Sequence, residues 1–255
     1  MKIIKFIASF LLFLGVLVLM VWAIIKSNDQ TCNHISVLIN GSKNTQLLTE
    51  SDVLRILKTN NAECQGKAIK DIELTTVHKI LAQENYIKTV DKVHFSGSKL
   101  QIEITLYDIL LEVQPTNGEK FLLDMNGTYL PYSPKTGNDV IVVQSVPHYN
   151  FKKKETISSN NSELFELFTV ASLIRQDPFY SALFHRLSIN EKREIVLHPS
   201  VGNLPVLFGA AQDAQSKLKS LKCMYEDVLP YTDENKYARL DVRFKNRIVA
   251  TKSKT

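Results

Sequence analysis

The chain has 255 residues, of which 44% are hydrophobic, and a formal net charge of +5. This length is enough for one large domain or for two small ones, each with its own core. The basic excess is modest, and neither interleaved aromatic residues nor a recognition helix accompanies it, so the composition does not predict a nucleic-acid partner.

The N-terminus carries the longest apolar segment. Residues 6–25 contain no charged side chain, and at about 1.5 Å each they match the roughly 30 Å of hydrocarbon in a bilayer. We expect a single transmembrane helix here, with residues 1–5 as a cytoplasmic tail because Lys2 and Lys5 obey the positive-inside rule. Residues 26–33 would be a linker, and the rest would lie outside the cytoplasm. A cleaved signal peptide is the alternative, but its apolar region is normally shorter.

The next segment shows a strand followed by two helices. A β-branched run over 35–39 predicts the strand. Thr49 begins a capping-box pattern in which its side chain accepts a hydrogen bond from the amide of Asp52, which predicts a helix over 50–58. An amphipathic stripe predicts the second helix over 71–84.

Two alternating runs, 93–95 and 100–106, then flank the turn signal Ser96-Gly97-Ser98 and predict a β-hairpin. The resulting order, β-α-α-β-β, spans residues 34–113. It resembles a POTRA domain, a small α+β module that docks polypeptides.

Beyond residue 113 the pattern changes to short strands and turns, interrupted by helical stripes over 162–175 and 211–227. Pro178 is expected to end the first of these helices. The predicted fold class is therefore α+β: a single N-terminal transmembrane helix, the POTRA-like β-α-α-β-β module, and a mixed β-rich domain with two helices over 114–255. The strands expected in this domain are 121–124, 140–143, 193–197, 204–208 and 237–244.

The cysteines give no pairing pattern. Cys32, Cys64 and Cys223 are widely spaced and form no C-x-x-C. An odd number at irregular spacing specifies no connectivity. Free buried thiols and a Cys32–Cys64 disulfide both remain open.

No complete catalytic or metal-binding motif occurs. The six histidines show no H-x-x-x-H or H-E-x-x-H spacing, so no metal site is predicted. Two of the three signatures of penicillin-binding proteins occur: S-x-x-K begins at Ser96 and at Ser216, and K-T-G begins at Lys135. The third, S-D-N, is missing. Ser96 lies in a predicted turn and Ser216 follows K-T-G instead of preceding it, so we interpret these strings as accidental. We therefore predict a protein that is not an enzyme and that has no cofactor and no small-molecule substrate.

Three motifs, in this order, resemble those of a known family. F-L-L-D-M-N-G-T-Y-L at 121–130 is similar to an Asp- and Gly-containing hairpin, L-P-V-L-F-G at 204–209 precedes a Lys-rich helix, and Y-A-R-L-D-V-R-F at 237–244 ends in an Asp-x-Arg-aromatic signature. With the order of segments, they make the whole chain resemble the FtsQ/DivIB family of bacterial cell-division proteins. Tyr107-Asp108 departs from the family, because many members carry Glu-Arg or Glu-Lys followed by Pro there.

The resemblance implies a bitopic scaffold in the cytoplasmic (inner) membrane at the division septum. Such a protein links FtsB and FtsL to septal peptidoglycan synthesis in the divisome. The alternative is a POTRA-bearing factor of envelope or secretion assembly, which would call for tandem modules or a many-stranded β-barrel.

The chain end is the expected partner site. After the strand at 237–244, Lys245-Asn246 can turn and residues 247–250 offer an extended apolar segment. A sheet edge recruits a partner strand through main-chain hydrogen bonds, and the basic side chains would suit an acidic partner. A closing strand guarded by charge is the alternative. The predicted partner-binding residues are Tyr237, Arg243, Phe244, Lys245, Arg247, Ile248 and Val249.

Overall fold

A computed structural model of the chain divides into two compact units between Leu106 and Tyr107, and each unit is described by itself. The structure describes residues 13–20, 30–41, 47–137, 140–147, 149–152, 154–160, 162–232, 236–244 and 247–253.

The prediction of a transmembrane helix over 6–25 is wrong. The described part of that stretch is a helix over residues 13–20, and a helix of this length extends only about 12 Å, less than half of the roughly 30 Å of a bilayer's hydrocarbon. Nowhere among the described residues is there a helix with the length and apolar character needed to cross a membrane. The remainder of 6–25 lies outside the described residues.

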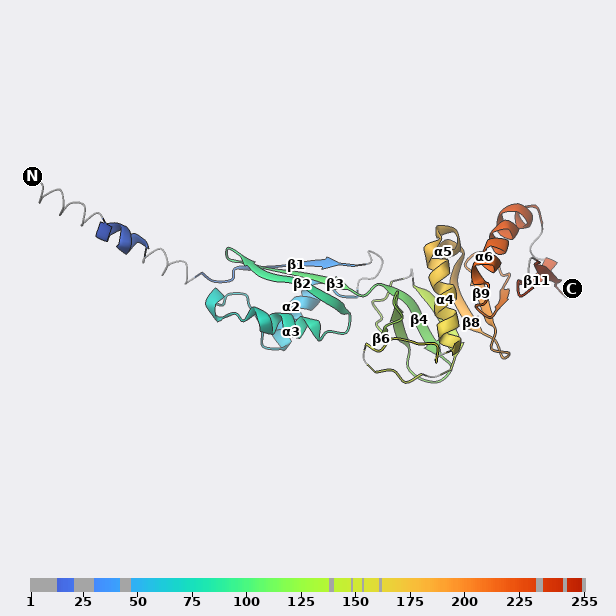
Figure 1. Ribbon diagram of the computed structural model, residues 1–255, viewed down its shortest axis with the longest axis horizontal. Helices are drawn as coiled ribbons and strands as arrows, with labels where there is room; N and C mark the ends of the chain where they lie inside the picture. Colours follow the sequence, from blue (N-terminus) through green and yellow to red (C-terminus); the bar gives the residue numbers. More distant parts are fainter. Residues whose placement is uncertain are drawn as a thin grey trace, which may run out of the picture. The chain divides into compact units, whose positions relative to one another are not determined.

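The first unit is a three-stranded sheet with two helices. Its strands are β1 (His34–Asn40), β2 (Ile87–Ser96) and β3 (Lys99–Leu106), in the order β1-β3-β2. β1 runs parallel to the central β3, whereas β2 runs antiparallel to it. α2 (Glu50–Thr59) and α3 (Leu74–Ala82) lie together on one face of the sheet (Figure 1). The predicted β-α-α-β-β order is confirmed.

The helix starts of this unit follow from local hydrogen bonds. The Asp52 amide donates to the Thr49 hydroxyl at 3.3 Å, and the Thr49 amide donates to the Asp52 carboxylate at 3.0 Å. This reciprocal pair is the predicted capping box. The second helix starts later than predicted, because the 3₁₀ turn η1 (Ile69–Asp71) precedes it.

The second unit contains a nine-stranded mixed sheet in the order β12-β11-β10-β9-β8-β7-β4-β5-β6. β8 is the middle strand of this order, and β4 lies in the sheet because it pairs with both β5 and β7. The hairpin β5–β6 closes one end of the sheet, and the C-terminal strand closes the other. The bounds are β4 (Ile109–Pro115), β5 (Phe121–Asp124), β6 (Tyr129–Pro131), β7 (Ile141–Val146), β8 (Phe184–Ile189), β9 (Ile195–Pro199), β10 (Val206–Gly209), β11 (Tyr237–Asp241) and β12 (Val249–Lys252).

Helices pack on this sheet. α4 (Ser162–Gln176) lies across the strands (Figure 1), and its Leu167 and Ile174 are fully buried. Pro178 ends α4 as predicted but also begins a helix that the sequence did not predict, α5 (Pro178–Leu183), where Asp177 accepts a hydrogen bond from Phe179. Proline suits the first turn of a helix because its missing N–H would be unpaired there anyway.

The last helix changes its winding along its length. α6 (Ala214–Cys223) continues as the π-helical turn η2 (Met224–Val228) and then as the 3₁₀ turn η3 (Leu229–Tyr231). Leu218 and Leu221 of α6 join the same core as α4 and the strands. This helix stands beside the end of the sheet that carries β11.

Candidate functional site at the C-terminal sheet edge

The chain ends as an added strand at one end of the sheet. β11 runs parallel to β10 on one side and antiparallel to β12 on the other. β12 is the terminal strand in the sheet order. The strand predicted over 237–244 ends at Asp241, and the following segment returns to form the edge itself.

Hydrogen bonding assigns the amides of β12 to its two sides. The Ser253 amide donates to the Lys236 carbonyl at 2.8 Å, just beyond the paired strands. Backbone N–H groups alternate between the two sides of a strand. The amides of Val249 and Thr251 therefore point toward β11, whereas those of Ala250 and Lys252 point to the open side.

Arg243 fixes the segment between β11 and β12. Its guanidinium contacts Asp241 at 2.6 Å through Nη2 and Glu194 at 2.6 Å through Nη1. Its own backbone amide also donates to Asp241 at 3.1 Å. Such charge-assisted bonds are short and roughly twice as strong as neutral ones. Arg243 thus joins the start of the edge segment to the turn between β8 and β9.

The electrostatics of this cluster follow from the contacts. Burial by itself would raise the pKa of Asp241, but hydrogen bonds and charge from Arg243 outweigh it and hold that pKa below its ordinary value. The Asn190 side chain and then Arg243 lower the pKa of Glu194. The hydrogen bonds that Arg243 donates to the carboxylates of Asp241 and Glu194 raise the pKa of Arg243. The cluster is therefore fully ionised near neutral pH.

Gly209 makes room for Arg243. It has φ +77°, and a Cβ built there would lie 2.8 Å from Cγ of Arg243. A side chain at this position would push against the arginine and would also occupy a backbone conformation that favours glycine.

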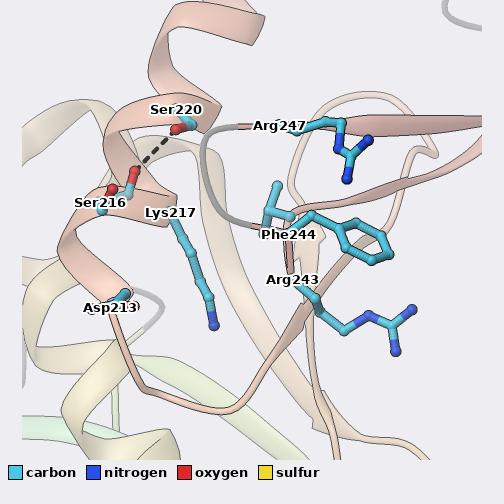
Figure 2. Close-up of a pocket in the computed structure, with 8 residues that line it drawn as sticks. Asp213, Ser216, Lys217, Ser220, Arg243, Phe244 and Arg247 are labelled. Carbon is cyan, nitrogen blue, oxygen red and sulfur yellow. Dashed lines mark hydrogen bonds between the residues drawn. The ribbon is translucent and has the colours of Figure 1, made fainter.

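Phe244 projects from the same segment. Its ring lies between two guanidinium groups, with Cζ of Arg243 at 5.9 Å and Cζ of Arg247 at 5.5 Å from the ring centroid (Figure 2). The residue is 45% exposed. Arg247 makes no ion pair with any residue that the structure describes. The ring is therefore held outside the core, on a basic surface.

A small hollow of about 140 Å³ separates this segment from α6 (Figure 2). Lys217 of α6 points into it and donates to the carbonyls of Phe208 and Ala210. Burial lowers the pKa of Lys217, against the opposing charges of Asp213 and Glu166. Its walls are Asp213, Ser216, Lys217, Ser220, Val242, Arg243, Phe244 and Arg247.

The predicted partner-binding residues lie together in this region, apart from Lys245, which is outside the described residues. Tyr237 and Ile248 are half-buried against the core, whereas Arg243, Phe244, Arg247 and Val249 are exposed. Glu194 belongs to none of the motifs that the sequence offered. Gly209 ends the L-P-V-L-F-G motif and Lys217 lies in the Lys-rich helix after it, but neither motif connects these residues with the chain end, which the folding of the sheet brings beside them.

The arrangement of the described side chains does not suggest a metal site. Within the described ranges, no group of three or more His, Cys, Asp or Glu side chains is arranged to hold a metal ion. The charged side chains of the edge are engaged with one another or face solvent. The arrangement is suited to contact with another polypeptide.

Each of the two units matches a model of a known protein family. A family model described as FtsQ/DivIB, C-terminal related, matches residues 110–251, and a model of a POTRA-like domain matches residues 30–105. No curated protein matches the chain. Domains of these two kinds are typically non-catalytic, and the first suggests partners in the division machinery and a septal location.

Proposed function

Because this chain belongs to the FtsQ/DivIB family, we propose that it is a non-enzymatic scaffold of the divisome that binds FtsB and FtsL and links them to septal peptidoglycan synthesis. The observation that carries the proposal is the open β12 edge at the end of the family-matched domain. An unpaired edge offers main-chain donors and acceptors to an incoming strand.

The side chains around this edge supply selectivity. Phe244 is the proposed anchor, because aromatic residues dominate the energetics of protein interfaces and its ring is exposed. Arg247 and Val249 extend the contact along the edge, and Tyr237 and Ile248 support it from the core side. Lys245, which follows Phe244 in the sequence, is included in the proposal as a further cation.

Arg243 has two roles in the proposed site, one in positioning the edge segment and one in the charge of the surface. Its side chain is 34% exposed while its guanidinium binds Asp241 and Glu194. It therefore positions the segment and leaves positive charge at the surface. An acidic partner segment fits this surface, because complementary charge guides encounter and suppresses wrong partners.

Depletion of the protein in its native cell tests the proposal. We expect long undivided filaments, restored to normal length by the full chain and by a Phe165→Ala variant, which changes an exposed aromatic residue of α4 away from the edge. Normal cell length after depletion would contradict the proposal. Envelope leakage with normal division would favour a POTRA-bearing assembly factor instead.

A further inference from the structure

Two cysteines far apart in the sequence meet at one backbone junction in the first unit. The Cys32 amide donates to the Lys67 carbonyl at 2.9 Å, and the Gly66 amide donates to the Cys32 carbonyl at 2.8 Å. The Lys67 amide in turn donates to the Cys64 carbonyl at 3.3 Å. Cys64 thus opens the turn against which Cys32 is held.

The side chains of both cysteines are buried, with exposures of 0% for Cys32 and 2% for Cys64. Burial raises the pKa of Cys64, and the charge of Cys32 raises it further. The backbone hydrogen bonds of Cys32 to Gly66 and Lys67, and the turn from Cys64 to Lys67, bring the two residues together. The thiols are free in this structure.

Access to the two thiols differs. Cys64 lines a hollow of about 140 Å³ at the surface, whose walls include Lys67 and Thr76, whereas Cys32 is not among its lining residues. Cys223, in α6, is exposed. A reagent in solution therefore has an approach to Cys64 that it lacks to Cys32.

We propose that Cys32 and Cys64 are a redox pair that closes to an intramolecular disulfide by exchange with a small disulfide such as oxidised glutathione. The pair would tie Cys32, two residues before β1, to the turn that follows α2. The resulting loop contains both elements, and a cross-link of this kind stabilises a fold mainly by restricting the unfolded chain.

The exchange takes two steps. The Cys64 thiolate attacks one sulfur of the small disulfide, which forms a mixed disulfide and releases one thiol. The Cys32 thiolate then attacks the Cys64 sulfur, which forms the Cys32–Cys64 bond and releases the second thiol. Two cysteine thiols are oxidised, and their two electrons and two protons reduce one small disulfide to two thiols.

Peptide mass spectrometry after alkylation tests the pair. The full-length protein, with Cys223→Ser to prevent cross-linking between chains, is incubated with excess oxidised glutathione, both folded and during refolding from urea. We expect a peptide that links Cys32 to Cys64 and a higher melting temperature for the oxidised form. The folded Cys32→Ser variant should stop at one glutathione on Cys64, and the folded Cys64→Ser variant should leave Cys32 unmodified.

The refolding experiment is included because burial can slow the reaction of the folded protein. Both thiols are accessible in the unfolded chain, so the disulfide can form during refolding. Cys32→Ala and Cys64→Ala replace either serine variant that does not fold. Free thiols at both positions after refolding, or glutathione on both without a link between them, would overturn the proposal.

Discussion

The guanidinium of Arg243 donates to the carboxylate of Glu194 at 2.6 Å, and so joins the segment that leads to the terminal edge strand to the turn between β8 and β9. The same guanidinium holds the buried carboxylate of Asp241. One side chain therefore fixes the edge segment against two parts of the sheet.

Arg243→Ala should lower the free energy of unfolding by about 2 kcal/mol. The change leaves the buried Asp241 without its cation, although partial exposure of the pair makes the cost smaller than for a fully buried one. Urea denaturation of the two proteins measures the difference. Arg247→Ala is the matched control, since this arginine has no ion pair among the described residues, and a change below about 0.5 kcal/mol is expected. Equal effects of the two variants would show that the Arg243 contacts contribute nothing specific.

The free energy of unfolding should decrease at acidic pH, in part because Asp241 and Glu194 lose their interaction with Arg243. Asp241 and Glu194 have lowered pKa values in the folded chain. They therefore stabilise the fold above their ordinary pKa of about 4, and this contribution is lost as the pH falls through the folded pKa values. Denaturation midpoints followed from about pH 6 to about pH 3 should decline more steeply for the unchanged protein than for Arg243→Ala. The same decline of the midpoint with pH in both proteins would show that the contacts of Arg243 do not cause the pH dependence.

Gly209→Ala should destabilise the second unit more than the same change elsewhere. The new Cβ meets Cγ of Arg243 at 2.8 Å and takes a positive φ, so a loss of about 2 kcal/mol is expected. Gly97→Ala is the control, because Gly97 also has positive φ but has nothing within 4 Å of the built Cβ. Thermal unfolding measures the destabilisation by each variant. A smaller loss of stability for Gly209→Ala than for Gly97→Ala would mean that the Arg243 side chain moves aside without a cost in stability.

The sequence predicted local features well. The capping box at Thr49 is a contact between near neighbours, so the pattern of four residues was enough to predict it. The hairpin at Asn126-Gly127 formed for a similar reason: Asp124 accepts the amides of Asn126 and Thr128.

Features that depend on distant contacts were missed. Strict alternation along residues 237–244 would put Ala238 and Phe244 on the same face as the buried Leu240, yet Ala238 is exposed, Phe244 is 45% exposed, and Asp241 is buried. Asp241 is inside because Arg243 neutralises it, and no periodicity rule includes such a pair. The family motifs located the region of the candidate site, but only the fold showed that Glu194 and Gly209 lie against Arg243.

Phe244→Ala should weaken partner binding by about 2 kcal/mol, or about thirtyfold, with little loss of stability. The residue is 45% exposed and its ring lies beside two guanidinium groups, so its removal should mainly affect the interface. Phe165→Ala is the matched control, with an aromatic ring of similar exposure at 39%. Titration of the purified proteins with FtsB and FtsL measures the affinities, and equal losses for both variants would move the anchor elsewhere.

Binding to FtsB and FtsL by an Ala250→Pro variant tests the edge most directly. Proline removes an amide that points to the open side of β12, whereas Ala250→Ser keeps it and serves as the control. One ladder hydrogen bond contributes about 1 kcal/mol, so the proline variant should bind at least about fivefold more weakly than the serine variant, while both stay folded by circular dichroism. Undiminished binding by folded Ala250→Pro would contradict partner docking on the β12 edge.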